Sequence, residues 1–199
     1  MTLWPSLRRE APALVALALP FAASAACGRP LPPLALSAAL TGVGLYAGLV
    51  LFPLVDPVRR ARWDAKPLPG LRLALAVVTA ATALLTARAL FVGDAEAAHR
   101  VGLLATVALL AVVGNALPAL PPNLFIGIRL PWTVRDRRVW AETHRAAGHG
   151  LVAVALGLAA LWPVLDVGAY QSLTTAAILL ALAASAVHSW LLSRRLPSA

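Results

Sequence analysis

The chain has 199 residues, of which 60% are hydrophobic and only 13% are charged, and its mean hydropathy is +0.81. A soluble domain is roughly 45–50% apolar and about 25% charged. The composition therefore excludes a water-soluble globule and a disordered chain, and it indicates an integral membrane protein. The single cysteine, Cys27, excludes an intrachain disulfide and a cysteine zinc cluster.

Spanning about 30 Å of hydrocarbon takes roughly 17–25 apolar residues in a helix. Six apolar runs approach this length and show no strand-like alternation. They cover residues 11–27, 34–55, 71–92, 101–117, 146–165 and 173–192. The sequence therefore predicts an all-α, polytopic integral membrane protein with six transmembrane helices, which form a single membrane domain over residues 1–199.

The net charge of +9 lies mostly in the short segments between the apolar runs. This pattern is typical of contact with anionic membrane lipids and of topology signals, and we expect no direct nucleic-acid binding. One side of the predicted topology carries 14 of the 17 Lys and Arg residues. The positive-inside rule then predicts a multi-pass protein of the bacterial inner (cytoplasmic) membrane, with both termini and the loop 118–145 in the cytoplasm.

The first apolar run has a second interpretation. Arg8 and Arg9 precede it and it ends in Ala-Cys-Gly, which is similar to a signal peptide with a lipoprotein cleavage site. Ser24 stands where such sites have an apolar residue, and five further apolar runs follow. We therefore expect an uncleaved first helix.

The loop 118–145 and its flanks hold nearly all the unusual chemistry of the chain. Residues 114–148 read GNALPALPPNLFIGIRLPWTVRDRRVWAETHRAAG. The segment IGIR-x-PWT, followed by VW, THR and G at these spacings, resembles the signature of the SdpI family of six-helix bacterial membrane proteins. The site residues that we carry over from this resemblance are Asn115, Asn123, Gly127, Arg129, Pro131, Trp132, Thr133, Trp140, Thr143, His144 and Arg145.

The resemblance implies toxin immunity, because the family is named after the immunity protein against the sporulation-delay toxin. It also implies capture of a cytoplasmic transcriptional repressor at the membrane, as in the named member. The partners would then be membrane lipids, a secreted peptide toxin and a repressor, without a cofactor. Family members often carry a longer extracytoplasmic segment between the first two helices, whereas here this connection covers only about residues 28–33.

The physical properties of the motif predict a cap at the membrane interface. Pro118, Pro121 and Pro122 end the fourth helix, and the apolar residues around Gly127 are too few to span the bilayer. We expect this segment to fold back against the helix ends, with Arg129 bound to phosphates or to unpaired carbonyls.

A short amphipathic helix should follow the cap and lead into the fifth transmembrane helix. Thr133 is a predicted N-cap with Asp136 three residues on, so the helix would begin near Val134. Trp140, Thr143, His144 and Ala147 would share one face, and Arg135, Arg137 and Arg138 would lie off it. Trp132 and Trp140 would lie in the aromatic belt of the membrane.

Three functions of different classes are compatible with these features. The first is toxin immunity or membrane-based signalling through repressor capture, and it is not enzymatic. The second is a small transporter or permeability factor. The third is a membrane enzyme with a site at Arg129 and His144. His144 and His149 are five residues apart and do not share a helix face as zinc ligands at i, i+4 would, so we predict neither a catalytic nor a metal site.

On the second predicted span, Gly44 and Gly48 form a small-xxx-small pattern, which favours close packing of helices.

Overall fold

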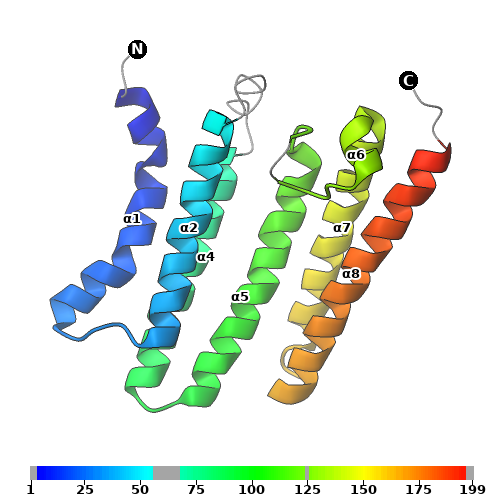
Figure 1. The fold of residues 1–199 in the computed structure, drawn as a ribbon. Coiled ribbons are helices and arrows are strands. Elements are labelled where there is room, and N and C mark those ends of the chain that lie inside the picture. The colour runs from blue at the N-terminus through cyan, green and yellow to red at the C-terminus, as the bar shows by residue number, and fades with distance from the viewer. Residues whose placement is uncertain (1–3, 56–67, 124–125, 196–199) are drawn as a thin grey trace. The chain divides into compact units, whose positions relative to one another are not determined.

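The structure is a computed structural model that describes residues 4–55, 68–123 and 126–195. All regular elements in these ranges are helical, as Figure 1 shows. They are α1 (Trp4–Cys27), α2 (Pro33–Val55), α4 (Leu68–Phe91), α5 (Ala95–Ala116), η1 (Leu117–Ala119), α6 (Pro131–Arg135), α7 (Arg137–Leu161) and α8 (Val167–Arg195). Six of the described helices are long and apolar enough to cross a membrane, which confirms the predicted fold class.

The chain divides into two compact units. Unit 1 comprises residues 1–55 and 64–109 and contains α1, α2, α4 and most of α5. Unit 2 comprises residues 56–63 and 110–199 and contains the end of α5 together with η1, α6, α7 and α8. The predicted motif loop therefore lies within unit 2.

Helix α4 is the central element of unit 1, because both α1 and α2 pack against it. Small residues allow this close approach: Ala76 and Ala83 are fully buried in α4. A Cβ added to Gly42 of α2 would come within 2.8 Å of the Cβ of Thr79, so glycine is required where these two helices meet. Gly44, predicted from the sequence to be a packing position, has open space at its Cβ.

A charged cluster joins the three helices α1, α2 and α4. Glu10 accepts a hydrogen bond of 2.6 Å from Nη1 of Arg72 and one of 3.0 Å from the hydroxyl of Tyr46. Nη2 of Arg72 donates to the carbonyl of Leu49 at 3.0 Å. The side chains of Arg72 and Glu10 are only 14% and 19% exposed. Arg72 lies at the start of the predicted third span, and the structure pairs it with Glu10 where α4 meets α1.

Several helices begin earlier than the apolar runs indicated. α5 begins at Ala95 rather than 101, because Asp94 accepts a hydrogen bond from the amide of Ala97 at its first turn. α1 contains Pro20 and bends in its second half (Figure 1), as proline within a helix requires. Pro163 lies just beyond Leu161, the last residue of α7.

Candidate functional site: a cap on the fifth membrane helix

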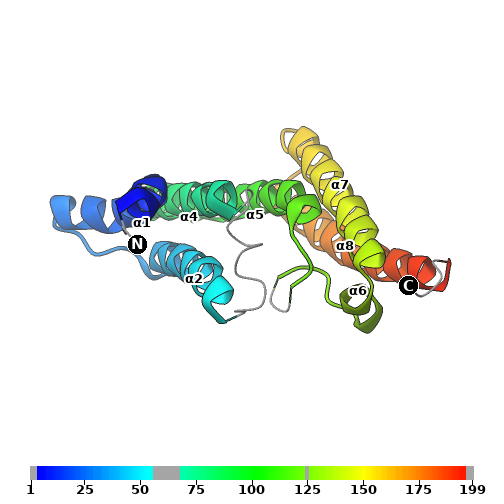
Figure 2. The ribbon, with the colours of Figure 1, turned by 90° about the horizontal axis from the view of Figure 1, so that it is seen from above.

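In unit 2 the chain from residue 120 to residue 136, here called the cap, connects η1 to α7. Figure 2 shows α6, the short helix of the cap, beside the first turns of α7 and the last turns of α8. Both helices contact α6, and η1 contacts α7. The cap therefore folds back onto the helix ends, as the apolar character of its sequence predicted.

The predicted apolar stripe forms one buried face of α7. Trp140, Thr143, His144 and Ala147 are between 0% and 7% exposed. They do not belong to a separate amphipathic helix, because α7 runs without interruption from Arg137 to Leu161. The prediction of an aromatic-belt position for Trp140 was therefore wrong: the ring is 1% exposed and packs inside unit 2.

His144 ties the cap to α7. The backbone N–H of Ile128 donates to Nε2 of His144 at 3.0 Å, and Nδ1 lies 2.8 Å from the carbonyl of Trp140. An amide N–H can only donate, so Nε2 is the acceptor and Nδ1 carries the proton. The imidazole is therefore held as the neutral Nδ1–H tautomer. Its ring stacks on Trp140, with centroids 3.9 Å apart and an angle of 18° between the planes.

Gly127 makes this contact possible. Its φ of 113° lies in the region that residues with a side chain rarely adopt. A Cβ at this position would also overlap Nε2 of His144. Glycine is thus required at this position for two reasons. It allows the positive φ of the turn, and it lets the amide of Ile128 approach His144.

Two more side chains fix the first half of the cap. Nδ2 of the buried Asn123 donates to the carbonyls of Pro121 and Ile126 at 2.9 and 3.0 Å, and its Oδ1 accepts from the amide of Ile126 at 2.7 Å. Nε1 of Trp140 donates to the carbonyl of Leu120 at 3.0 Å. Motif side chains therefore satisfy several backbone polar groups in the described part of this irregular segment.

The helix signals near Thr133 act differently from the prediction. α6 begins at Pro131 with Leu130 as its N-cap residue, and Thr133 is its third residue. The hydroxyl of Thr133 accepts from the amide of Leu130 at 2.9 Å and donates to the carbonyl of Ile128 at 2.7 Å. Thr133 therefore closes the cap instead of starting α7.

Asp136 supplies the N-cap of α7. Its carboxylate accepts hydrogen bonds from the amides of Arg138 and Val139 at 2.7 and 3.2 Å. The sequence identified Asp136 as a capping residue but placed it in the first turn of a helix that begins near Val134. In the structure α6 ends at Arg135, and Asp136 is the N-cap residue of α7.

Trp132 links the cap to α8. Its Nε1 donates to the hydroxyl of Ser189 at 3.0 Å, and Ser189 is fully buried. The sequence placed Trp132 in the aromatic belt and gave no sign of this bond, because the two residues are 57 positions apart. α8 therefore shares in holding the cap.

The remaining predicted site residues form no hydrogen bond that holds the cap. Arg129 is exposed and has no hydrogen bond or ion pair with any described residue, so the predicted contact with unpaired carbonyls is not formed. Arg145 is exposed and pairs with Glu142 at 3.1 Å. Asn115 is exposed on α5. Thr143 is buried, but its hydroxyl lacks a hydrogen-bond partner within the described ranges.

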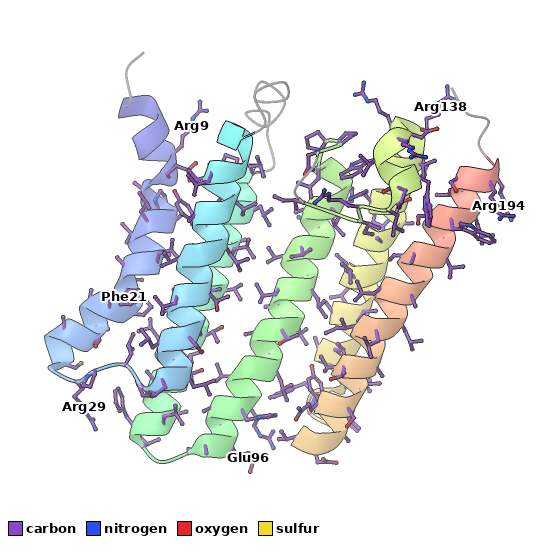
Figure 3. The ribbon with its side chains drawn as sticks, viewed as in Figure 1. Arg9, Phe21, Arg29, Glu96, Arg138 and Arg194 are labelled. Carbon is purple, nitrogen blue, oxygen red and sulfur yellow. The ribbon has the colours of Figure 1, made fainter. Side chains whose placement is uncertain are left out.

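Five arginines surround the cap and form what is here called the basic face. They all lie on the exposed surface of the cap and the first turns of α7: Arg129, Arg135, Arg137, Arg138 and Arg145. In Figure 3, Arg138 lies at the same end of unit 2 as Arg194 of α8. Within the described ranges no group of three or more His, Cys, Asp or Glu side chains could hold a metal ion.

The fold and this site define a helical membrane protein whose fifth membrane-length helix carries a hydrogen-bonded cap. Residues 119–191 match the SdpI/YfhL protein family, and this segment runs from η1 through the cap and α7 into α8. The match confirms the resemblance seen in the motif. Neither a curated protein nor a solved structure matches the chain.

Proposed function

We propose that this protein acts in toxin immunity or membrane-based signalling, as an SdpI-like protein of the bacterial cytoplasmic membrane. The observation that carries the proposal is the family match over residues 119–191, which includes the whole cap. The concentration of basic residues on one side of the membrane supports a cytoplasmic location for both termini and for the cap.

The cap has the properties of a docking surface. Hydrogen bonds that Asn123 and Thr133 donate, and one that His144 accepts, fix its backbone, and Trp132 anchors it to α8. The basic face projects from this rigid support, so a partner would meet preorganised charges with little loss of conformational entropy. Acidic surfaces are complementary to it, either on a cytoplasmic repressor or on lipid headgroups.

The geometry favours binding over catalysis. Both ring nitrogens of His144 are already engaged within the protein and the side chain is 1% exposed, so it is poorly placed to exchange a proton with a substrate. Arg129 is exposed, and the hydrogen bonds of His144 go to Ile128 and Trp140 instead. We therefore propose that the protein is not an enzyme and needs no cofactor.

Expression in bacteria sensitive to the sporulation-delay toxin tests the immunity proposal. Cells that produce the protein should survive the toxin and keep their membrane potential, whereas cells with an empty vector should lose both. If producing cells have the protein in the membrane at normal levels and die like the control, the immunity proposal is wrong. A fall in membrane potential without toxin would instead favour the permeability alternative.

Charge reversal on the basic face tests partner capture. In the variant Arg135→Glu/Arg137→Glu/Arg138→Glu, a repressor that is bound at the membrane should return to the soluble fraction, because each basic residue near an anionic surface contributes roughly 1 kcal/mol. The topology of the variant is checked with reporter fusions, since the substitutions reduce the inside charge. Arg9→Glu is the control, because Arg9 is exposed on α1 and lies outside the basic face.

A further inference from the structure

Unit 1 contains a pocket of about 260 Å³ between α1 and α4. Its wall is mostly apolar and includes Pro20, Ala23, Leu84 and Phe91. Arg29 and Arg88 also line the pocket. In Figure 3, Arg29 lies at the end of unit 1 opposite to Arg9, so the pocket is at the opposite end from the N-terminal basic residues. These two arginines belong to the minority of three basic residues that the sequence places on the sparsely charged side of the membrane.

No described carboxylate compensates either arginine. The guanidinium of Arg29 lies over the ring of Phe91, with Cζ 4.3 Å from the centroid. The acidic residues that follow α4 are engaged elsewhere: Glu96 pairs with Arg100 at 2.8 Å, and Asp94 accepts from the first turn of α5. The pocket thus combines an apolar wall with two positive charges that lack a protein counter-ion.

We propose that this pocket binds an anionic phospholipid, with the phosphate between Arg29 and Arg88 and one acyl chain along the apolar wall. Guanidinium groups match the geometry of phosphate oxygens and can each donate two hydrogen bonds. A lipid is favoured over a peptide because the wall is built from membrane-length helices, whose outer surface contacts acyl chains. The proposal is independent of the function proposed for the cap.

Thermal unfolding of the purified full chain in neutral detergent tests the proposal. Phosphatidylglycerol should raise the Tm saturably, because a ligand that binds only the folded state stabilises it. Phosphatidylcholine with the same acyl chains should raise the Tm much less. The variant Arg29→Gln/Arg88→Gln should lose the difference between the two lipids, whereas the matched control Arg100→Gln, whose arginine already has a carboxylate partner, should keep it.

Two further variants separate the charges from the apolar wall. Arg29→Lys/Arg88→Lys keeps both charges and should retain part of the response to phosphatidylglycerol, so it decides the question if the glutamine variant fails to fold. Ala23→Trp fills the pocket from an exposed position and should weaken the response while both arginines remain.

Four results would overturn the proposal. The first is an equal response to both lipids in the wild type, which indicates ordinary boundary lipid. The second is a full response to phosphatidylglycerol in the glutamine variant. The third is an equally large shift with inorganic phosphate alone, which indicates a free-anion site. The fourth is saturable stabilisation by an acidic peptide with none by phosphatidylglycerol, which indicates a protein partner.

Discussion

Two kinds of residue share the motif. One kind is buried and fixes the cap, and Asn123, Thr133 and His144 are examples with exposures of 0–1%. The other kind is exposed, and Arg129 and Arg145 represent it. The sequence identified both sets as unusual but could not separate them, because a motif shows which residue types occur together and not which of them face inward. The burial of each side chain in the structure separates the two sets.

Gly127→Ala should destabilise the protein by roughly 1–3 kcal/mol, because the backbone would be strained and the new Cβ would overlap His144. The matched control is Gly93→Ala. Gly93 also has a positive φ, of 80°, but open space surrounds its Cβ position. Thermal unfolding in detergent should show a clearly larger fall in Tm for Gly127→Ala. Equal falls would mean that the contact with His144 has no energetic importance.

Arg129→Ala should leave thermal stability unchanged, since the arginine is exposed and forms no hydrogen bond or ion pair with a described residue. Capture of a cytoplasmic partner, or binding to vesicles with anionic lipids, should weaken because one charge of the basic face is lost. The measurement pairs the Tm with a vesicle-flotation assay. A large loss of Tm would show that the arginine supports the cap after all.

At the scale of elements, the sequence predicted all six membrane-length helices because hydropathy is a local property of the chain. The ends of the helices were less well predicted. α7 begins at Arg137 rather than near 146, since Asp136 caps it and polar residues then continue the helix. The polar turns at the start of α7 give no hydropathy signal. A capping residue such as Asp136 also does not show which of two adjacent helices it starts.

Close contact between α5 and α7 also depends on a long-range pair. A Cβ on Gly114 would lie 2.8 Å from the carbonyl oxygen of Gly148, and a Cβ on Gly148 would meet Pro118 at 2.8 Å. Both glycines belong to the family signature seen in the sequence. Their physical role is the close approach of two helices, which allows the cap to reach from one to the other.

Asp136→Ala should lower stability by about 1 kcal/mol, because two amides at the start of α7 lose their acceptor. Asp136→Ser should recover most of that loss, since serine is also a good N-cap residue. Circular dichroism during thermal unfolding measures both. If the alanine variant melts with the wild type, water already satisfies these amides.

At the scale of the whole molecule, the charged cluster of unit 1 was not predicted. Glu10 and Arg72 are 62 residues apart, and each lies at the edge of an apolar run where a charge normally signals topology. Only the bonds of Arg72 to Glu10 and to the carbonyl of Leu49 show that it is part of a helix contact. The sequence predicts a single membrane domain. The division into two compact units does not test this, so it stays a prediction.

Glu10→Gln should destabilise the protein strongly, by up to roughly 3–5 kcal/mol, because Arg72 would remain largely buried without its counter-ion. The double variant Glu10→Gln/Arg72→Gln should recover part of the loss. Glu96→Gln is the matched control, since its partner Arg100 is exposed and such pairs contribute little. Tm values of the wild type and the three variants measure these effects, and equal losses for Glu10→Gln and Glu96→Gln would contradict the importance of the buried pair.

We propose that the motif is a structural cap and not a reaction centre. The measurement that tests it most directly is the Tm of purified His144→Ala together with protection of toxin-treated cells. The account predicts a fall in Tm equivalent to about 1–3 kcal/mol, because the amide of Ile128 loses its acceptor and Trp140 its stacking partner. Protection should fall in parallel. A His144→Ala protein with the stability and membrane level of the wild type but no protection would contradict the cap and favour a chemical role for the histidine.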